Sequence, residues 1–181
     1  GLRPQQLERS RRERLDPALY HPAKLDTDQW LAAAKAMGAK YAHFTASHEN
    51  GLLQWQSDLP HGLKEVTWWR EGKGDIVADF VASCRRVGIT PGIYIGLRRN
   101  AFWGVWERKV NWGRGGDEAK QAAYDRMCEK QVAELCSRYG DWVEVWFDAG
   151  GEALSTVGAT LVDGAATGWA PGRTGLPLTV M

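Results

Sequence analysis

The 181-residue sequence lacks several features that would assign it to a common functional class. Lys and Arg number 23 against 22 Asp and Glu, so neither charge is in excess. Nothing in this balance favours binding to nucleic acid or to a membrane surface. No apolar run is long enough to cross a bilayer, and no charged and then apolar secretory signal is visible at the start. We therefore expect neither nucleic acid nor membrane as a partner.

Motifs for metals, nucleotides and hydrolytic triads are also missing. The three cysteines are not at metal-ligand spacing, and we interpret them as small core residues: Cys84, Cys128 and Cys136. The glycine cluster at 113–116 follows no strand and has no suitably placed Lys-Ser/Thr pair, which argues against a phosphate loop. No Ser, His and Asp arrangement surrounds a nucleophile elbow. We expect no metal and no cofactor.

What the chain does contain is tryptophan and apolar surface. It has ten Trp and a hydrophobic content of 44%, enough to bury a core in one domain or most of one. The composition changes towards both ends. We expect a basic, solvated leader at residues 1–14, a folded part at 15–151, and a loop-rich or poorly ordered tail at 152–181, where Gly, Ala and Thr dominate.

Helices and strands are predicted to alternate in the folded part. Amphipathic patterns, each stopping at a glycine, predict helices at 26–37, 75–87 and about 117–139. Each glycine is followed by a strand-like run, at 41–46, 92–95 and 143–148. This order repeats with a period of roughly 50 residues and predicts parallel β/α units.

The loops after the first two strands are long, at 47–74 and 97–116. A (β/α)₈ barrel builds its active site from such loops, whereas an open doubly wound sheet places the site at a topological switch point. Six of the ten Trp lie in these loops, namely Trp55, Trp68, Trp69, Trp103, Trp106 and Trp112. Trp faces suit the C–H faces of sugars, so together they predict a ligand-binding mouth. For any single Trp, packing between the loops is the more ordinary interpretation.

Asp148 is the strongest candidate for a reactive residue. It ends an apolar run and precedes Ala149-Gly150-Gly151, so a carboxylate stands where a strand meets a loop. Alternation along the strand places Trp146 on the same face as Asp148. The alternative is ordinary turn chemistry, because Asp before glycine is common in turns.

Polar residues after the first strand indicate the same end of the sheet. His48 and Glu49 directly follow this strand, and Trp55 comes a few residues later. They predict a cluster that binds hydroxyl groups, since one His beside one Glu lacks the ligand count of a metal site. His48 could equally be a packing histidine, and we expect His43, within the strand, to belong to the core.

Five segments occur in the order and at the spacing of one enzyme family. They are HPAKLDTDQW at 21–30, TASH at 45–48 leading to QW at 54–55, GDIV at 74–77, GIYI at 92–95, and VWFDAG at 145–150. In these segments the chain resembles the α-L-fucosidases of glycoside hydrolase family 29, over roughly residues 15–151. Family members hydrolyse terminal α-L-fucose with net retention on a barrel-like β/α domain. The resemblance implies an α/β fold, a partial (β/α)₈ TIM-like barrel with parallel strands and intervening helices.

The resemblance also implies roles for particular residues. Asp148 corresponds to the nucleophile, Trp146 would line the fucose pocket, and His48 would bind sugar hydroxyls. Tyr94 lies in a strand where the family often has paired tyrosines. The chain departs from the family at Glu49, where many members have a second His, and this bears on substrate preference. The predicted substrate-binding set is His48, Glu49, Trp55, Tyr94 and Trp146.

A retaining mechanism needs a second carboxyl group, which protonates the leaving oxygen and then activates water. In the family this acid/base follows the nucleophile, and only Glu152 and Asp163 follow Asp148 here. A complete barrel takes about 250 residues and eight strands. We therefore expect residues 15–151 to be part of a catalytic domain, with other strands encoded before and after it. An incomplete parallel sheet would expose its edges and favour association, but the sequence assigns no oligomeric state.

The predicted partner is a fucosylated glycan, and the resemblance implies a secreted, periplasmic or lysosomal location. Two other interpretations remain open. The fold could bind sugar without turning it over, as a non-catalytic carbohydrate-binding fragment. More remotely, Asp148 could form an aspartyl-phosphate in a phosphohydrolase, although the second Asp that such sites usually need is missing from Asp148-Ala149-Gly150.

Overall fold

The computed structural model describes residues 20–58, 69–148 and 178–180, and at Asp148 and 178–180 it describes the backbone. The expected leader at 1–14 and most of the expected tail at 152–181 lie outside these residues. None of the helices within the described ranges is long and apolar enough to span a bilayer.

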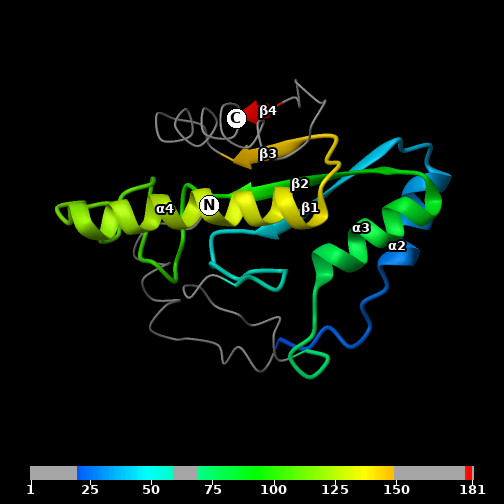
Figure 1. Ribbon diagram of the computed structural model, residues 1–181, viewed down its shortest axis with the longest axis horizontal. Coiled ribbons are helices and arrows are strands. Elements are labelled where there is room, and N and C mark those ends of the chain that lie inside the picture. Colours follow the sequence, from blue (N-terminus) through cyan, green and yellow to red (C-terminus); the bar gives the residue numbers. More distant parts are fainter. Residues whose placement is uncertain (1–19, 59–68, 149–177, 181) are drawn as a thin grey trace.

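The described strands form one parallel sheet. Its strands are β1 (Tyr41–Ser47), β2 (Thr90–Gly96), β3 (Val145–Asp148) and β4 (Leu178–Val180), and they lie side by side in that order (Figure 1). The first three confirm the predicted strands to within three residues at each end. The strand β4 was not predicted, since it lies within the segment expected to be loop.

Within the described ranges, a helix precedes each of β1, β2 and β3, which confirms the predicted pattern. These helices are α2 (Thr27–Ala36), α3 (Ile76–Val87) and α4 (Glu118–Tyr139). An aspartate caps each one, because the side chains of Asp26, Asp75 and Asp117 accept hydrogen bonds from backbone N–H groups of the first turn. The helix α3 ends at Gly88, whose φ of 68° is in the left-handed region that favours glycine.

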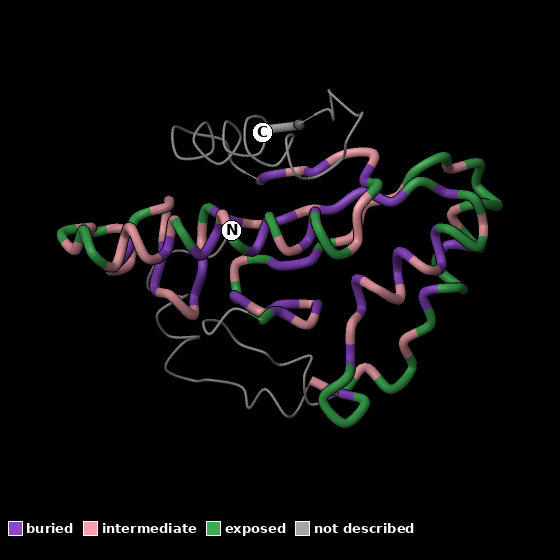
Figure 2. Tube along the Cα trace, in the orientation of Figure 1, coloured by how far each residue is buried: buried purple, intermediate pink, exposed green. Residues whose placement is uncertain are grey.

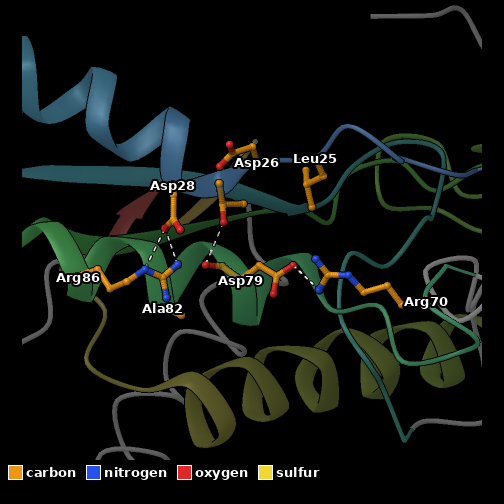
Figure 3. Close-up of a pocket in the computed structure, with 8 residues that line it drawn as sticks. Leu25, Asp26, Asp28, Arg70, Asp79, Ala82 and Arg86 are labelled. Atoms are coloured by element: carbon orange, nitrogen blue, oxygen red, sulfur yellow. Dashed lines mark hydrogen bonds and ion pairs between the residues drawn. The ribbon is translucent and has the colours of Figure 1, made fainter.

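The junction between α2 and α3 is polar. Thr27 and Ser83 share a hydrogen bond of 2.7 Å between their hydroxyl oxygens, and Ser83 donates to Asp28 at 2.7 Å. A depression of about 210 Å³ opens beside this junction (Figure 3). Its charged groups pair with one another, as Arg70 with Asp79 and Arg86 with Asp28. The depression lies at the contact between two helices. Because its charged groups already pair with one another, we do not interpret it as a ligand site.

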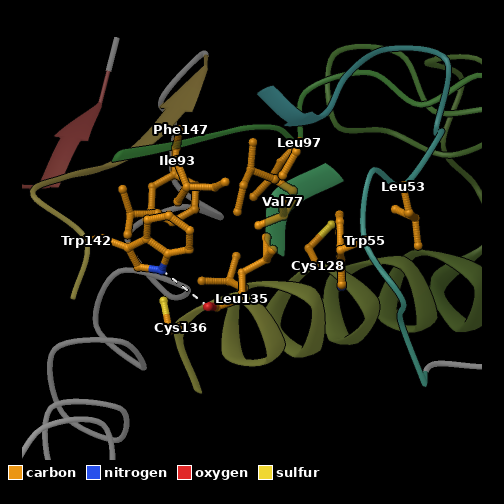
Figure 4. Packing of buried hydrophobic residues seen from close by; sticks show 14 of the residues in the cluster. Leu53, Trp55, Val77, Ile93, Leu97, Cys128, Leu135, Cys136, Trp142 and Phe147 are labelled. Carbon is orange, nitrogen blue, oxygen red and sulfur yellow. Dashed lines mark hydrogen bonds between the residues drawn. The ribbon is translucent and has the colours of Figure 1, made fainter. Parts of the chain in front are cut away.

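All three helices pack on one face of the sheet. A single apolar cluster joins Leu31 of α2, Val77 of α3 and Leu135 of α4 to Ile93 and Phe147 of the strands. Figure 2 shows buried positions concentrated along β2 and β3, and Figure 4 shows α4 packed against this cluster. In the described part of the chain, the helices cover one face of a sheet whose strands follow their order in the sequence, whereas a doubly wound sheet has helices on both faces. The described residues form an open sheet.

The opposite face of the sheet carries the alternate residues of each strand. These are Tyr41, His43 and Thr45 of β1, Gly92, Tyr94 and Gly96 of β2, and Trp146 of β3. Glu144, the residue just before β3, lies on the same face. The expectation that His43 belongs to the core is therefore wrong. Its side chain, 17% exposed, lies on the face away from the helices, because strand side chains alternate.

Candidate active site

On the sheet face away from the helices, most of the polar and aromatic residues form three rows that run across the sheet from β1 to β3. The floor row is His43, Gly92 and Glu144; the middle row is Thr45, Tyr94 and Trp146; the rim row is His48, Gly96 and the backbone of Asp148. Strand register defines the rows, since it pairs His43 with Gly92, Thr45 with Tyr94, Tyr94 with Trp146, and Gly96 with Asp148. The backbone N–H of Ile93 donates to the Glu144 carbonyl at 3.1 Å, which places Glu144 opposite Gly92, and His48 lies next to Gly96.

The middle and rim rows bring three of the predicted site residues together. The rings of Tyr94 and Trp146 meet edge to face, with centroids 5.6 Å apart and planes at 78°. The His48 ring stacks on Tyr94 with centroids 5.6 Å apart and planes at 15°. Trp146 is half-buried and His48 is exposed. The result is an aromatic surface that ends at the carboxyl edge of the sheet, where parallel β/α proteins bind ligands.

Gly96 explains how His48 comes to lie there. The pairing of β1 with β2 shifts between Thr45 and Ser47. After this irregularity the next residue, His48, lies next to Gly96 at the end of β2. A Cβ on Gly96 would lie 3.3 Å from the His48 Cα, so a larger residue would crowd this crossing. Gly96 in turn pairs with Asp148. His48 and the backbone of Asp148 thus flank the same glycine, while the Asp148 side chain lies outside the description and its role stays a prediction.

Glu49 is held by the loop that follows β2. Its Oε1 accepts a hydrogen bond of 2.7 Å from Nη1 of Arg99. The Nη2 of Arg99 donates to Glu107 at 2.8 Å, and its guanidinium lies 4.1 Å from the ring centre of Trp106. Glu49 therefore follows His48 with its carboxylate bound by Arg99. That Glu49 contacts a substrate remains a prediction.

The charges of this network support one another. Burial disfavours the Arg99 cation, but hydrogen bonds to Glu107 and Glu49 and the attraction of their charges together outweigh burial and raise the pKa of Arg99. Burial likewise disfavours the Glu107 carboxylate, but hydrogen bonds from Arg99 and Arg98 and the attraction of their charges together outweigh it and lower the pKa of Glu107. The loop after β2 is thus tied to the end of β1 by ionised groups.

The prediction that Trp55 faces a ligand is wrong. Its side chain is 1% exposed within the main core, and its indole N–H donates to Glu134 of α4 at 3.1 Å. Trp69 is 5% exposed and packs with Ile76. Packing between loops and helices is therefore the correct interpretation for these two residues. Trp103, Trp106 and Trp112 are half-buried, and Trp68 lies outside the described residues.

Two features of this face were missed by sequence reasoning. The first is the floor row, where His43 Nε2 lies 2.9 Å from Glu144 Oε2 across Gly92. The second is the anchoring role of Arg99. Both depend on which residues of separate strands lie opposite each other, which no local motif encodes. In the described ranges no three His, Cys, Asp or Glu residues are grouped so as to hold a metal ion.

Comparison with known proteins decides the family. The model of the α-L-fucosidase family matches residues 15–168. The chain belongs to the α-L-fucosidase family. It is 36% identical over 135 residues to a rice protein provisionally named α-L-fucosidase 1, covering 75% of this chain and 24% of the rice protein. The resemblance inferred from the sequence motifs is therefore confirmed.

Solved structures similar to this chain come from the same enzyme family. A structure from Bacteroides thetaiotaomicron, provisionally named an α-L-fucosidase, is 45% identical with a TM-score of 0.70, over 80% of this chain and 35% of that one. A glycoside hydrolase family 29 member from a rumen bacterium is 29% identical with a TM-score of 0.57, over 76% of this chain and 22% of that one. The chain thus spans about a quarter of the rice relative and about a third of the Bacteroides structure.

Proposed function

We propose that the protein containing this chain hydrolyses terminal α-L-fucose from fucosylated glycans by a retaining double displacement, with Asp148 as nucleophile. Family membership supports the substrate class. The observation that carries the site is the register of β2 with β3, which puts Asp148 at the strand end beside the aromatic surface. In this proposal the sheet is part of a (β/α)₈ barrel, and the rows face its interior.

The chemistry assigns a task to each residue. The Asp148 carboxylate attacks the anomeric carbon and forms a glycosyl ester, while the bond to the leaving oxygen breaks. A second carboxyl group about 5–5.5 Å away gives its proton to that oxygen, then takes a proton from the water that hydrolyses the ester. Trp146 and Tyr94 offer apolar surface to the C–H face and methyl group of the deoxy-sugar. His48 and Glu49 pair with its hydroxyl groups.

The test is turnover of an aryl α-L-fucoside by the full-length protein. Asp148→Ala is expected to lower kcat by about three or more powers of ten, and added azide should restore turnover and yield the β-fucosyl azide. The matched control is Glu118→Ala, which removes an exposed carboxylate from the first turn of α4.

Each result has one interpretation. If Asp148→Ala folds normally and keeps full activity, the nucleophile assignment is wrong. If the wild-type protein binds fucose but does not turn over the fucoside, the non-catalytic interpretation replaces the enzyme.

A further inference from the structure

The floor row contains a His and a carboxylate that the proposed reaction does not use. His43 of β1 reaches across β2 towards Glu144, and the atoms Nε2 and Oε2 approach to 2.9 Å, a close polar contact whose angles are not those of a hydrogen bond. The crossing depends on Gly92, because a Cβ there would lie only 2.5 Å from Cδ2 and Nε2 of the imidazole. The His43 ring therefore occupies the place that a side chain of the middle strand would otherwise fill.

His43 also contacts Trp146 of the middle row. The two ring centroids are 5.9 Å apart with planes at 89°, an edge-to-face arrangement. Tyr41 also meets His43 edge to face, with centroids 5.7 Å apart and planes at 89°. His43 is thus enclosed by Tyr41, Gly92, Glu144 and Trp146. The side chains of His43 and Glu144 are only 17% and 20% exposed, so both are largely shielded from solvent.

Trp146 is held from two directions as a result. Tyr94 packs against it within the middle row, and His43 packs against it from the floor row. Edge-to-face contacts of this kind favour one orientation of a ring over others. Because Gly92 has no side chain, loss of the His43 ring would leave a void next to the indole, and a side chain beside a void gains rotational freedom.

We propose that His43 and Glu144 are positioning residues that fix the orientation of the Trp146 indole, with the imidazole packed against the Glu144 carboxyl group across Gly92. The structural part of this inference concerns Trp146 alone. Its kinetic part rests on the proposed function, in which Trp146 contacts the sugar. Neither His43 nor Glu144 is proposed to touch the reacting atoms.

The structural part is tested by fluorine-19 NMR of the full-length protein labelled with 5-fluorotryptophan, where Trp146→Phe assigns the Trp146 resonance. In wild type we expect one narrow line. In His43→Ala and Gly92→Ala the line should shift and broaden or split, since both variants remove the imidazole from its place. In His43→Gln it should stay near its wild-type position, because the amide can span Gly92 towards Glu144. Glu144→Gln should resemble His43→Gln, while Glu144→Ala should resemble His43→Ala.

The matched control is Ile93→Val. Ile93 is adjacent to Gly92 but faces the helices and is fully buried, so this variant loses stability without touching the floor row. We expect it to lower the unfolding temperature and to leave the Trp146 line unchanged. This separates a positioning role from general destabilisation.

The kinetic part is tested with the aryl fucoside. His43→Ala should raise KM about tenfold and change kcat less than threefold, since contacts made equally in ground and transition states affect binding alone. His43→Gln should stay within about threefold of wild type in both constants. The double variant His43→Ala/Glu144→Ala should be no worse than either single variant, because residues that act as a unit are not additive.

The two hypotheses fail in different ways. An unchanged Trp146 line in His43→Ala, or one disturbed equally by Ile93→Val, would overturn the positioning role whatever the activity. Absence of fucoside turnover in wild type would overturn the proposed function and leave the NMR result standing. If His43→Ala does not fold, the contrast between Glu144→Ala and Glu144→Gln decides the same question.

Discussion

The indole N–H of Trp55 donates to a carboxylate oxygen of Glu134 at 3.1 Å, and this bond joins the loop after β1 to α4. The same carboxylate accepts from the Ser57 hydroxyl at 2.6 Å and from the Asp58 backbone N–H at 2.9 Å. Glu134 has a side chain only 12% exposed and lies next to Arg138, which supplies a compensating charge. One largely shielded carboxylate thus fixes residues 55–58 of the loop after β1 against α4.

Replacement of Glu134 should destabilise the protein. Glu134→Ala leaves the buried Trp55 N–H and the Ser57 hydroxyl without their acceptor, so we expect the free energy of unfolding to fall by about 2–4 kcal/mol. Glu134→Gln keeps a neutral acceptor and should lose less. Thermal and urea unfolding measure both variants. Equal stability of Glu134→Ala and wild type would contradict this account of the loop.

The elements that sequence analysis predicted correctly are those specified by neighbouring residues. Asp26, Asp75 and Asp117 each cap a helix within three residues of themselves, and Gly88 ends α3 at the expected position. The strand β4 is only three residues long, and so short an element has no periodicity that a sequence pattern could reveal.

The features that were missed depend on contacts between distant parts of the chain. Trp55 and Glu134 are 79 residues apart, and nothing near Trp55 indicates that a carboxylate would accept from its indole. His43 approaches Glu144 only because β1, β2 and β3 align so that Gly92 lies between them. Family resemblance identified the candidate residues at the end of β3. The floor row could not be predicted in this way, because its residues come together only through the register of three strands.

Arg99 should matter more to stability than its neighbour Arg98. The Arg99 side chain is 16% exposed, binds two carboxylates and stacks on Trp106, whereas that of Arg98 is 45% exposed and contacts Glu107. Arg99→Lys loses the forked geometry and the stacking, so we expect a loss of about 1–2 kcal/mol in unfolding free energy. Arg98→Ala should cost less than about 0.5 kcal/mol. Urea unfolding of the two variants side by side is the measurement, and a larger loss for Arg98→Ala would refute the ranking.

Glu107 should make the stability of this loop depend on acid pH. Its pKa in the folded protein lies below the ordinary value of 4.5 because the hydrogen bonds from Arg99 and Arg98 and the attraction of their charges together outweigh burial. The ionised group therefore contributes stability above pH 4.5 that is lost as the pH falls through the lower, folded-state pKa. Glu107→Gln should lower the unfolding temperature at pH 7, and the difference from wild type should shrink towards pH 3. A difference that is constant between these pH values would show that the charge of Glu107 is not the cause.

The cysteines should be unreactive until the protein unfolds. Burial raises the pKa of Cys84 to about 11 and those of Cys128 and Cys136 to about 12, although the neighbouring Tyr124 hydroxyl partly opposes this at Cys128. A thiol with a pKa of 12 is ionised to about one part in ten thousand at pH 8, against about a tenth for one with a pKa of 9. Because the folded-state pKa lies above the unfolded value of 9.0, these thiols impose no penalty below pH 9. The folded state then loses stability as the pH rises from 9 towards 12.

Iodoacetamide labelling at pH 8, followed by peptide mass spectrometry, should find all three positions unmodified in native protein and alkylated in urea. Rapid labelling of Cys136 in native protein would show that α4 does not pack against the sheet as described, because Cys136 belongs to the cluster that joins them.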